Sequence, residues 1–128
     1  MKIEVSIGEI VDKLTILEIK KENIKDEDKL KNIQKEYDIL KDALPIIKKE
    51  CSPIEFEILF NQLININKKL WDIEERIREK ESLSEFDDEF IQIARSVYKF
   101  NDFRSKIKKE INILTKSNLI EQKSYYNI

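Results

Sequence analysis

The chain has 128 residues, 39% of them charged, with 26 acidic and 24 basic side chains. Its length predicts a single domain, residues 1–128, and its balanced charge argues against nucleic-acid binding, which normally needs a net basic face. The absence of histidine excludes a zinc site with imidazole ligands and a cysteine–histidine catalytic pair.

Residues 6–23 are predicted to form the first helix. Ser6 and Glu9 have the spacing of a capping box, which marks a helix start. Apolar residues at three–four spacing then share one face, namely Ile7, Ile10, Leu14, Leu17 and Ile24. No apolar leader precedes this helix, and no apolar run approaches the roughly 18 residues of a membrane span. The single Cys51 fits a reducing compartment, so we expect a cytoplasmic protein without membrane contact.

A second helix is predicted after the acidic cluster Asp26–Asp28, which suits the positive end of a helix dipole. Its stripe consists of Leu30, Ile33, Tyr37, Leu40 and Leu44. Pro45 removes a backbone donor and disfavours a helical Leu44. Two outcomes stay open: a kinked helix that continues to about Lys49, or a clean break.

The third and fourth helices are predicted to form a long antiparallel hairpin. Ser52-Pro53-Ile54-Glu55 combines a capping serine, a proline at the first helical position and a glutamate three residues after the cap. The third helix should end near Glu81, and the fourth should run from Ser84 or Glu85 to about Thr115. Since the connection is short, the two helices should pack antiparallel. The fold class is therefore an all-α antiparallel bundle built on this hairpin, with two shorter N-terminal helices.

Two further expectations concern the ends and the surface of this bundle. Residues 117–128 include the aliphatic side chains Leu119 and Ile120 and the tyrosines Tyr125 and Tyr126, which predicts a tail docked on the bundle. The hairpin is longer than the first two helices, so part of its apolar arc should stay uncovered. Because an exposed apolar patch usually marks an interface, we expect a homodimer.

Polar side chains interrupt the apolar arcs of the hairpin at helical spacing, and we call them the polar strip. Its members are Asn67, Glu74, Arg78 and Glu81 on the third helix and Asn101, Arg104, Lys108 and Asn112 on the fourth. Arg95 should reach Glu74 or Glu81. The rest of the charge run 72–81 is interpreted as a solvated face, and the series Asn61, Asn65 and Asn67 as polar filler at partly exposed positions.

Two interpretations of the polar strip stay open. A buried ion costs several kcal/mol unless it is paired, so the strip is either a salt-bridge network that sets helix register or a cleft for an anionic small molecule. In the second case the ligand-binding residues would be Arg78, Arg95, Asn101, Arg104, Lys108 and Asn112, and the catalytic candidates Glu74 and Glu81. Paired carboxylates can also hold Mg²⁺, but the neighbouring arginines argue against it, so we expect no metal or other cofactor.

Four segments in order resemble a family of short bacterial and phage helical domains, domain of unknown function 6165. They are "EVSIGEIVDKLTILEIKKENI", "KLWDIEERIREKE", "IARSVYKFNDFRSKIKKEIN" and "EQKSY". The family has no assigned activity, so the resemblance implies none for this chain. Because family members stand alone or beside glycosyltransferase modules, it implies as an alternative function a non-catalytic interaction or oligomerisation module accessory to glycan-building enzymes. Many polar-strip residues fall in the matching segments, which favours a site. The architecture alone also resembles helical chorismate mutases, whose buried Arg, Lys and Glu residues enclose a dicarboxylate.

Overall fold

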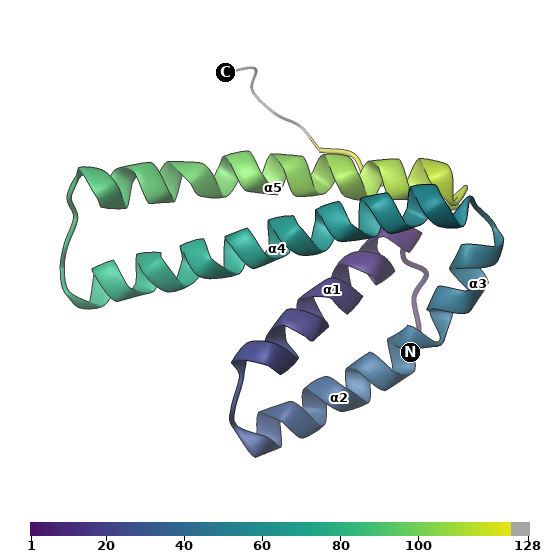
Figure 1. The fold of residues 1–128 in the computed structure, drawn as a ribbon, viewed down its shortest axis with the longest axis horizontal. Helices are drawn as coiled ribbons and strands as arrows, with labels where there is room; N and C mark the ends of the chain where they lie inside the picture. Colours follow the sequence, from purple (N-terminus) through teal and green to yellow (C-terminus); the bar gives the residue numbers. More distant parts are fainter. Residues whose placement is uncertain (124–128) are drawn as a thin grey trace.

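A computed structural model describes residues 1–123 of the chain. It contains the helices α1 (Ile7–Asn23), α2 (Glu27–Lys41), α3 (Ala43–Lys49), α4 (Pro53–Ser82) and α5 (Asp88–Leu114). No strand occurs within these residues, which confirms the all-α prediction. In Figure 1, α4 and α5 lie side by side as an antiparallel hairpin. α1 starts at the end of the hairpin remote from its turn and runs away from it, α2 returns along α1, and α3 links α2 to α4 (Figure 1).

The helix starts follow the capping signals of the sequence. The Ser6 hydroxyl accepts a hydrogen bond from the Glu9 N–H at 3.2 Å, and the Ser52 hydroxyl accepts one from the Glu55 N–H at 3.4 Å. Both satisfy backbone donors that have no partner inside the helix. The predicted starts of the first and third helices are therefore confirmed.

The interruption near Pro45 falls between the two predicted outcomes. α2 ends at Lys41 and α3 begins at Ala43, so the helix is broken at Asp42 and then continues to Lys49. Pro45 is the third residue of α3, where its missing N–H would have had no intrahelical partner. The proline thus fits inside a first helical turn, and the chain bends three residues before it.

The start of α5 differs from the prediction, which placed it at Ser84 or Glu85. Ser84 adopts a positive φ of 53°, and the N–H groups of Ser84 and Glu85 donate to the carbonyls of Glu81 and Lys80 at 3.1 and 2.9 Å. This is a Schellman ending of α4, which uses Ser84 to close one helix. The new helix is capped instead by Asp87, which accepts from the Phe90 N–H at 2.9 Å.

The apolar core lies where α1, α3, α4 and α5 meet, away from the hairpin turn. Its buried members are Val11, Ile47, Phe56, Leu63, Ile107 and Ile111. Gly8 is the only glycine, and a Cβ there would lie 2.6 Å from the Lys108 carbonyl oxygen and 2.9 Å from the Asn112 Oδ1. A side chain would therefore push α1 off α5, so the close crossing of these helices requires glycine.

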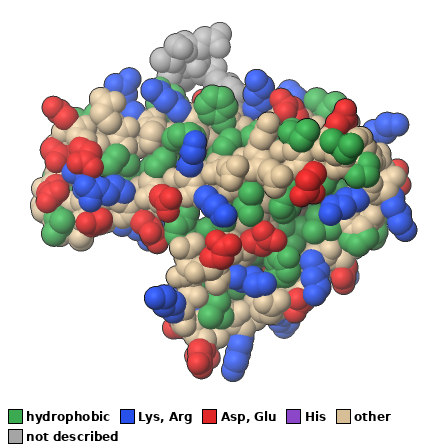
Figure 2. All heavy atoms as spheres, viewed as in Figure 1, with side chains coloured by type: hydrophobic (Ala, Val, Ile, Leu, Met, Phe, Trp, Pro, Cys, Tyr) green, Lys and Arg blue, Asp and Glu red, His purple; other side chains and the backbone are tan. Residues whose placement is uncertain are grey.

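The turn half of the hairpin, residues 72–100, projects beyond α1 and α2 (Figures 1 and 2), and we call it the distal hairpin. Within it Lys80 alone is buried. Phe86 is 57% and Ile91 49% exposed. The distal hairpin is thus a two-helix structure without an apolar core of its own.

The tail after α5 folds back onto the N-terminal end of α1. Lys116 has a positive φ of 54° and ends α5 as Ser84 ends α4. The Ser117 hydroxyl accepts from the Ile7 N–H at 3.0 Å, and Ser6 donates to Glu121 at 3.0 Å. The remainder of the tail for which docking was predicted, residues 124–128, lies outside the described residues. Of the described helices, none combines the length and apolarity needed to cross a membrane.

Candidate functional site

The polar strip divides into two halves according to whether α1 covers it. One half lies under the first turns of α1, where its side chains are hydrogen-bonded to α1. The other half lies where α1 leaves the hairpin, and it lines a groove. We call these the closed half and the open half.

In the closed half, acidic residues of α1 pair with a lysine of α5. Lys108 Nζ lies 2.7 Å from Glu9 Oε2 and 3.8 Å from Asp12 Oδ2. The Asn67 side-chain amide donates to Asp12 Oδ1 at 2.9 Å and to the Thr15 hydroxyl at 2.8 Å. Asn67 is only 4% exposed, so its interpretation as partly exposed filler was wrong: it joins α4 to α1.

Asn112 also belongs to the closed half, where it caps α1. Its Oδ1 accepts a hydrogen bond from the Gly8 N–H at 2.6 Å. The Ser117 hydroxyl accepts one from the Ile7 N–H, and the Ser6 hydroxyl accepts one from the Glu9 N–H. All three donors of the first turn are thereby satisfied, two of them from outside the helix. Asn112 and Lys108, both predicted to bind ligand, are thus occupied in holding α1 to α5.

The open half lines a groove of about 640 Å³ between α1, α4 and α5. Asn67 lies at its buried inner end, Asn101 and Arg104 are half-buried, and Glu74 and Arg78 are exposed at its outer end. The apolar lining residues are Ile16, Ile19, Leu70 and Trp71. The Trp71 indole N–H donates to Glu75 at 2.9 Å, which links two residues of the rim. The groove thus combines an apolar surface with amide, guanidinium and carboxylate groups.

Arg104 is the least satisfied side chain of this groove. Its Nε is covered by protein atoms, and no hydrogen-bond acceptor for it is found in the described part of the chain. Within residues 1–123, neither Arg104 nor Arg78 forms an ion pair. The cause lies in α1. Its acids that reach the hairpin, Glu9 and Asp12, lie in the first half of the helix, whereas Glu18 in the second half accepts a hydrogen bond from Tyr37 of α2 and isoleucines line the groove.

The remaining predicted site residues lie elsewhere. Glu81 and Arg95 are exposed and do not line the groove. Contrary to the prediction, Arg95 makes no ion pair with Glu74 or Glu81. The structure therefore brings together Glu74, Arg78, Asn101 and Arg104, and leaves the other candidates outside.

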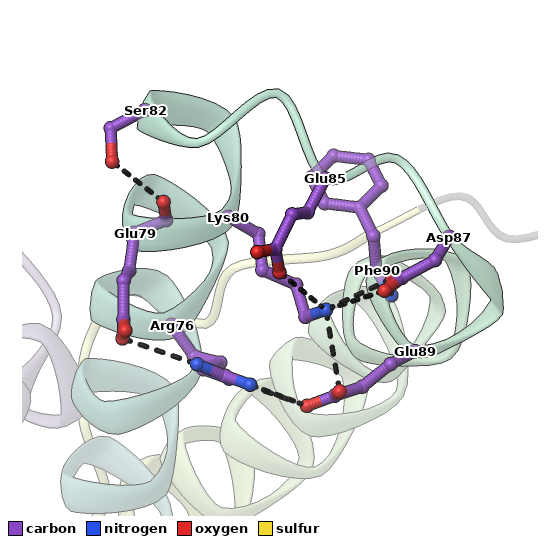
Figure 3. Close-up of polar contacts among 8 residues, drawn as sticks. All are labelled: Arg76, Glu79, Lys80, Ser82, Glu85, Asp87, Glu89 and Phe90. Atoms are coloured by element: carbon purple, nitrogen blue, oxygen red, sulfur yellow. Dashed lines mark hydrogen bonds and ion pairs between the residues drawn. The ribbon is translucent and has the colours of Figure 1, made fainter.

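A second charged cluster closes the tip of the hairpin, and the sequence interpretation missed it (Figure 3). Lys80 is 1% exposed, so its assignment to a solvated face was wrong. Its ammonium lies 2.9 Å from Asp87, 3.3 Å from Glu89 and 3.6 Å from Glu85, and Arg76 donates to Glu89 at 2.9 Å. The signal was present in the sequence as acids at alternate positions after the turn, Glu85, Asp87 and Glu89.

The pKa values in this cluster shift as close pairing requires. The Phe90 N–H and the Lys80 ammonium lower the pKa of Asp87. The pKa of Glu89 is lowered by Arg76 and then by Lys80, while the hydrogen bond to Asp87 raises the pKa of Lys80. These shifts keep Asp87, Glu89 and Lys80 charged at neutral pH, and the cations already have partners, so the cluster is a structural clasp of the turn.

Cysteine and metal chemistry find little support in the described residues. Cys51 is half-buried between α3 and α4, and desolvation together with the carboxylates of Glu55 and Glu50 raises its pKa. The thiol therefore stays protonated at neutral pH, which disfavours a nucleophile. Residues 1–123 contain no group of three or more acidic or cysteine side chains placed to hold a metal ion.

Comparison with known proteins identifies the family alone. No curated protein and no solved structure matches the chain. One family model, described as "Family of unknown function (DUF6165)", matches residues 1–128. This match confirms the resemblance inferred from the four sequence segments, and the chain belongs to this family of unknown function.

Proposed function

We propose that this protein binds a small anionic molecule in the groove between α1, α4 and α5. The observation that carries the proposal is Arg104, whose covered Nε has no acceptor among residues 1–123. A covered donor without a partner costs about 1–3 kcal/mol, more when the group is charged. A carboxylate or phosphate on the ligand would offset this cost through charge-assisted hydrogen bonds with the guanidinium.

The groove indicates the kind of ligand. Arg104 and Asn101 provide donors near the inner end, and Ile16, Ile19 and Leu70 provide an apolar wall. Arg78 adds a second cation at the outer end. A volume of about 640 Å³ lies within the range of small-molecule sites. We infer a ligand with one anionic group at Arg104 and an apolar portion along α1.

The proposal concerns binding, and it assigns no reaction. Of the two catalytic candidates, Glu74 lines the groove and Glu81 does not. A general acid or base must lie within hydrogen-bond reach of the reacting group, and the groove offers one candidate, Glu74, at its exposed end. An accessory role beside glycan-building enzymes and a cytoplasmic location remain predictions of the sequence and the resemblance.

The only tryptophan of the chain, Trp71, lines the groove, so its fluorescence is a direct readout. We would titrate the protein with inorganic phosphate and a panel of phosphorylated and carboxylated metabolites. We expect at least one saturable change in emission, which Arg104→Leu abolishes because the anion loses its partner. Arg95→Leu is the matched control, since this arginine is exposed and lies outside the groove. A wild-type protein that responds to no anion, or a response that survives Arg104→Leu, would refute the proposal.

A further inference from the structure

The distal hairpin presents one face that nothing in residues 1–123 covers. Lys108 and Asn112 of α5 contact α1, and Asn101 and Arg104 line the groove beside it. Residues three or four positions apart lie on the same side of a helix. Counted back from Asn101, these are Val97, Ala94 and Phe90, with Tyr98 at the edge. On α4 the same side continues from Asn67 to Glu74 and Arg78. We call these six residues, Glu74, Arg78, Phe90, Ala94, Val97 and Tyr98, the open face.

The open face carries one acidic and one basic residue, so it is complementary in charge to the same face of a second copy. Glu74 and Arg78 are one helical turn apart and have opposite signs. Neither forms an ion pair within the described chain. If α4 packs antiparallel on the α4 of a second copy with the two-fold axis at Arg76, Glu74 of each copy meets Arg78 of the partner subunit. A Glu–Arg pair at this spacing therefore forms two ion pairs in an isologous contact.

The apolar row of the open face fits the same axis. Ala94 of α5 lies level with Arg76 of α4. This register follows from the turn between Ser82 and Asp88 and from the Lys69 ammonium, which lies 5.5 Å from the Phe100 ring. The axis then passes at Ala94, whose small side chain allows α5 to approach its copy closely. Phe90 and Tyr98 lie four residues to either side, so Phe90 meets Tyr98 of the partner subunit. Apolar contacts line up along α5 and charged contacts along α4.

From these two rows we propose that the open face pairs with a second copy of this chain as a two-fold antiparallel four-helix contact. Between Leu70 and Ser82, α4 rises about 18 Å, and two helices are about 20 Å wide. The contact would then cover about 360 Å² on each copy, at the small end of weak, transient interfaces. We expect a dissociation constant of about 10–100 µM. The tip of the partner would end near Leu70, at the outer end of the groove, and would leave Arg104 and Asn101 free.

Sedimentation equilibrium from about 5 to about 500 µM covers this range of affinity. The apparent mass of the wild type should rise from 15.4 kDa toward twice that value. Ala94→Glu places two carboxylates at the axis and should weaken association at least about tenfold. Gln92→Glu adds the same charge at an exposed position on the opposite side of α5 and should leave it unchanged. A constant 15.4 kDa, or equal effects of the two variants, would overturn the proposal.

A charge exchange tests the register itself. Glu74→Arg alone and Arg78→Glu alone each oppose like charges across the axis, so each variant should remain monomeric. An equimolar mixture of the two restores both ion pairs and should associate as the wild type does. Failure of the mixture to associate would refute the antiparallel pairing. Glu74 and Arg78 also line the outer end of the groove, so anion binding is tested separately with Arg104→Leu, which lies outside the open face.

Discussion

Lys108 and Arg104 lie one helical turn apart on the same side of α5, yet their surroundings differ. Lys108 Nζ is 2.7 Å from a carboxylate oxygen of Glu9 and close to a second carboxylate. Arg104 faces the same helix α1 further along, and its Nε lacks an acceptor among residues 1–123. Two cations one helical turn apart thus differ in their pairing, because the acids of α1 that reach α5, Glu9 and Asp12, lie in its first turns, whereas Glu18 contacts Tyr37 of α2.

A strip of polar residues along a helical hairpin therefore need not have a single role. The structural interpretation, mutual salt bridges that set register, describes the closed half. The ligand-binding interpretation requires a cation that lines a groove and has no counter-ion within the protein. In the open half Arg104 lines the groove and forms no ion pair among residues 1–123.

Removal of the lysine of the closed half should cost the most. Lys108→Met leaves the buried Asp12 without its cation, and breaking a buried pair costs about 3–5 kcal/mol. We expect about 3 kcal/mol, because Glu9 is partly exposed. Urea denaturation measures the loss. Lys106→Met, at an exposed lysine without an ion pair among the described residues, should change the free energy of unfolding by less than about 0.5 kcal/mol. Equal losses would contradict the comparison.

The two asparagines offer a smaller contrast of the same kind. Asn112→Ala deprives the buried Gly8 N–H of its acceptor, which should lower the free energy of unfolding by about 2 kcal/mol. Asn101→Ala removes a groove side chain that has no hydrogen-bond partner among residues 1–123. This change should alter the free energy of unfolding by less than about 0.5 kcal/mol. Chemical denaturation of both variants in one buffer gives the difference. A larger loss for Asn101→Ala would reverse our assignment of the halves.

Arg104→Leu should have the opposite sign. It removes a guanidinium whose covered Nε has no partner among residues 1–123, and replacement of buried ions by apolar groups is often stabilising. We expect the free energy of unfolding in the absence of ligand to rise by about 1 kcal/mol. Calorimetric melting of this variant beside Arg95→Leu measures the change. A marked loss of stability would show that Arg104 is paired, and the groove would then be structural.

The smallest effect concerns pH and the clasp at the hairpin tip. The pKa values of Asp87 and Glu89 are lowered on folding, so their contribution to stability is present above about pH 4 and is lost as the pH falls through the lowered values. The pKa of Lys80 is raised, so its contribution is lost as the pH rises through the raised value. The difference in Tm between wild type and Lys80→Met should therefore shrink at both extremes. A difference that is constant from neutral to acid pH would exclude this clasp.

Local signals determined the elements of this protein. The serine–proline–glutamate start of α4 and the capping serine of α1 acted as predicted, because a cap depends only on residues within one turn. Apolar spacing likewise predicted the long hairpin, since helical periodicity decides which side of a helix is buried. The polar residues that interrupt this spacing were the signal from which a candidate site was predicted.

Tertiary structure decided which of these polar residues have partners. The sequence shows that Asn67, Arg104 and Lys108 share a side of the hairpin, but not where α1 crosses it. That crossing depends on Gly8 packing against the backbone of α5, a contact between residues about a hundred positions apart. Lys80 was likewise misassigned because its carboxylates come from beyond the turn. A charge is paired or unpaired according to distances between helices, and helical spacing within one segment carries no information about those distances.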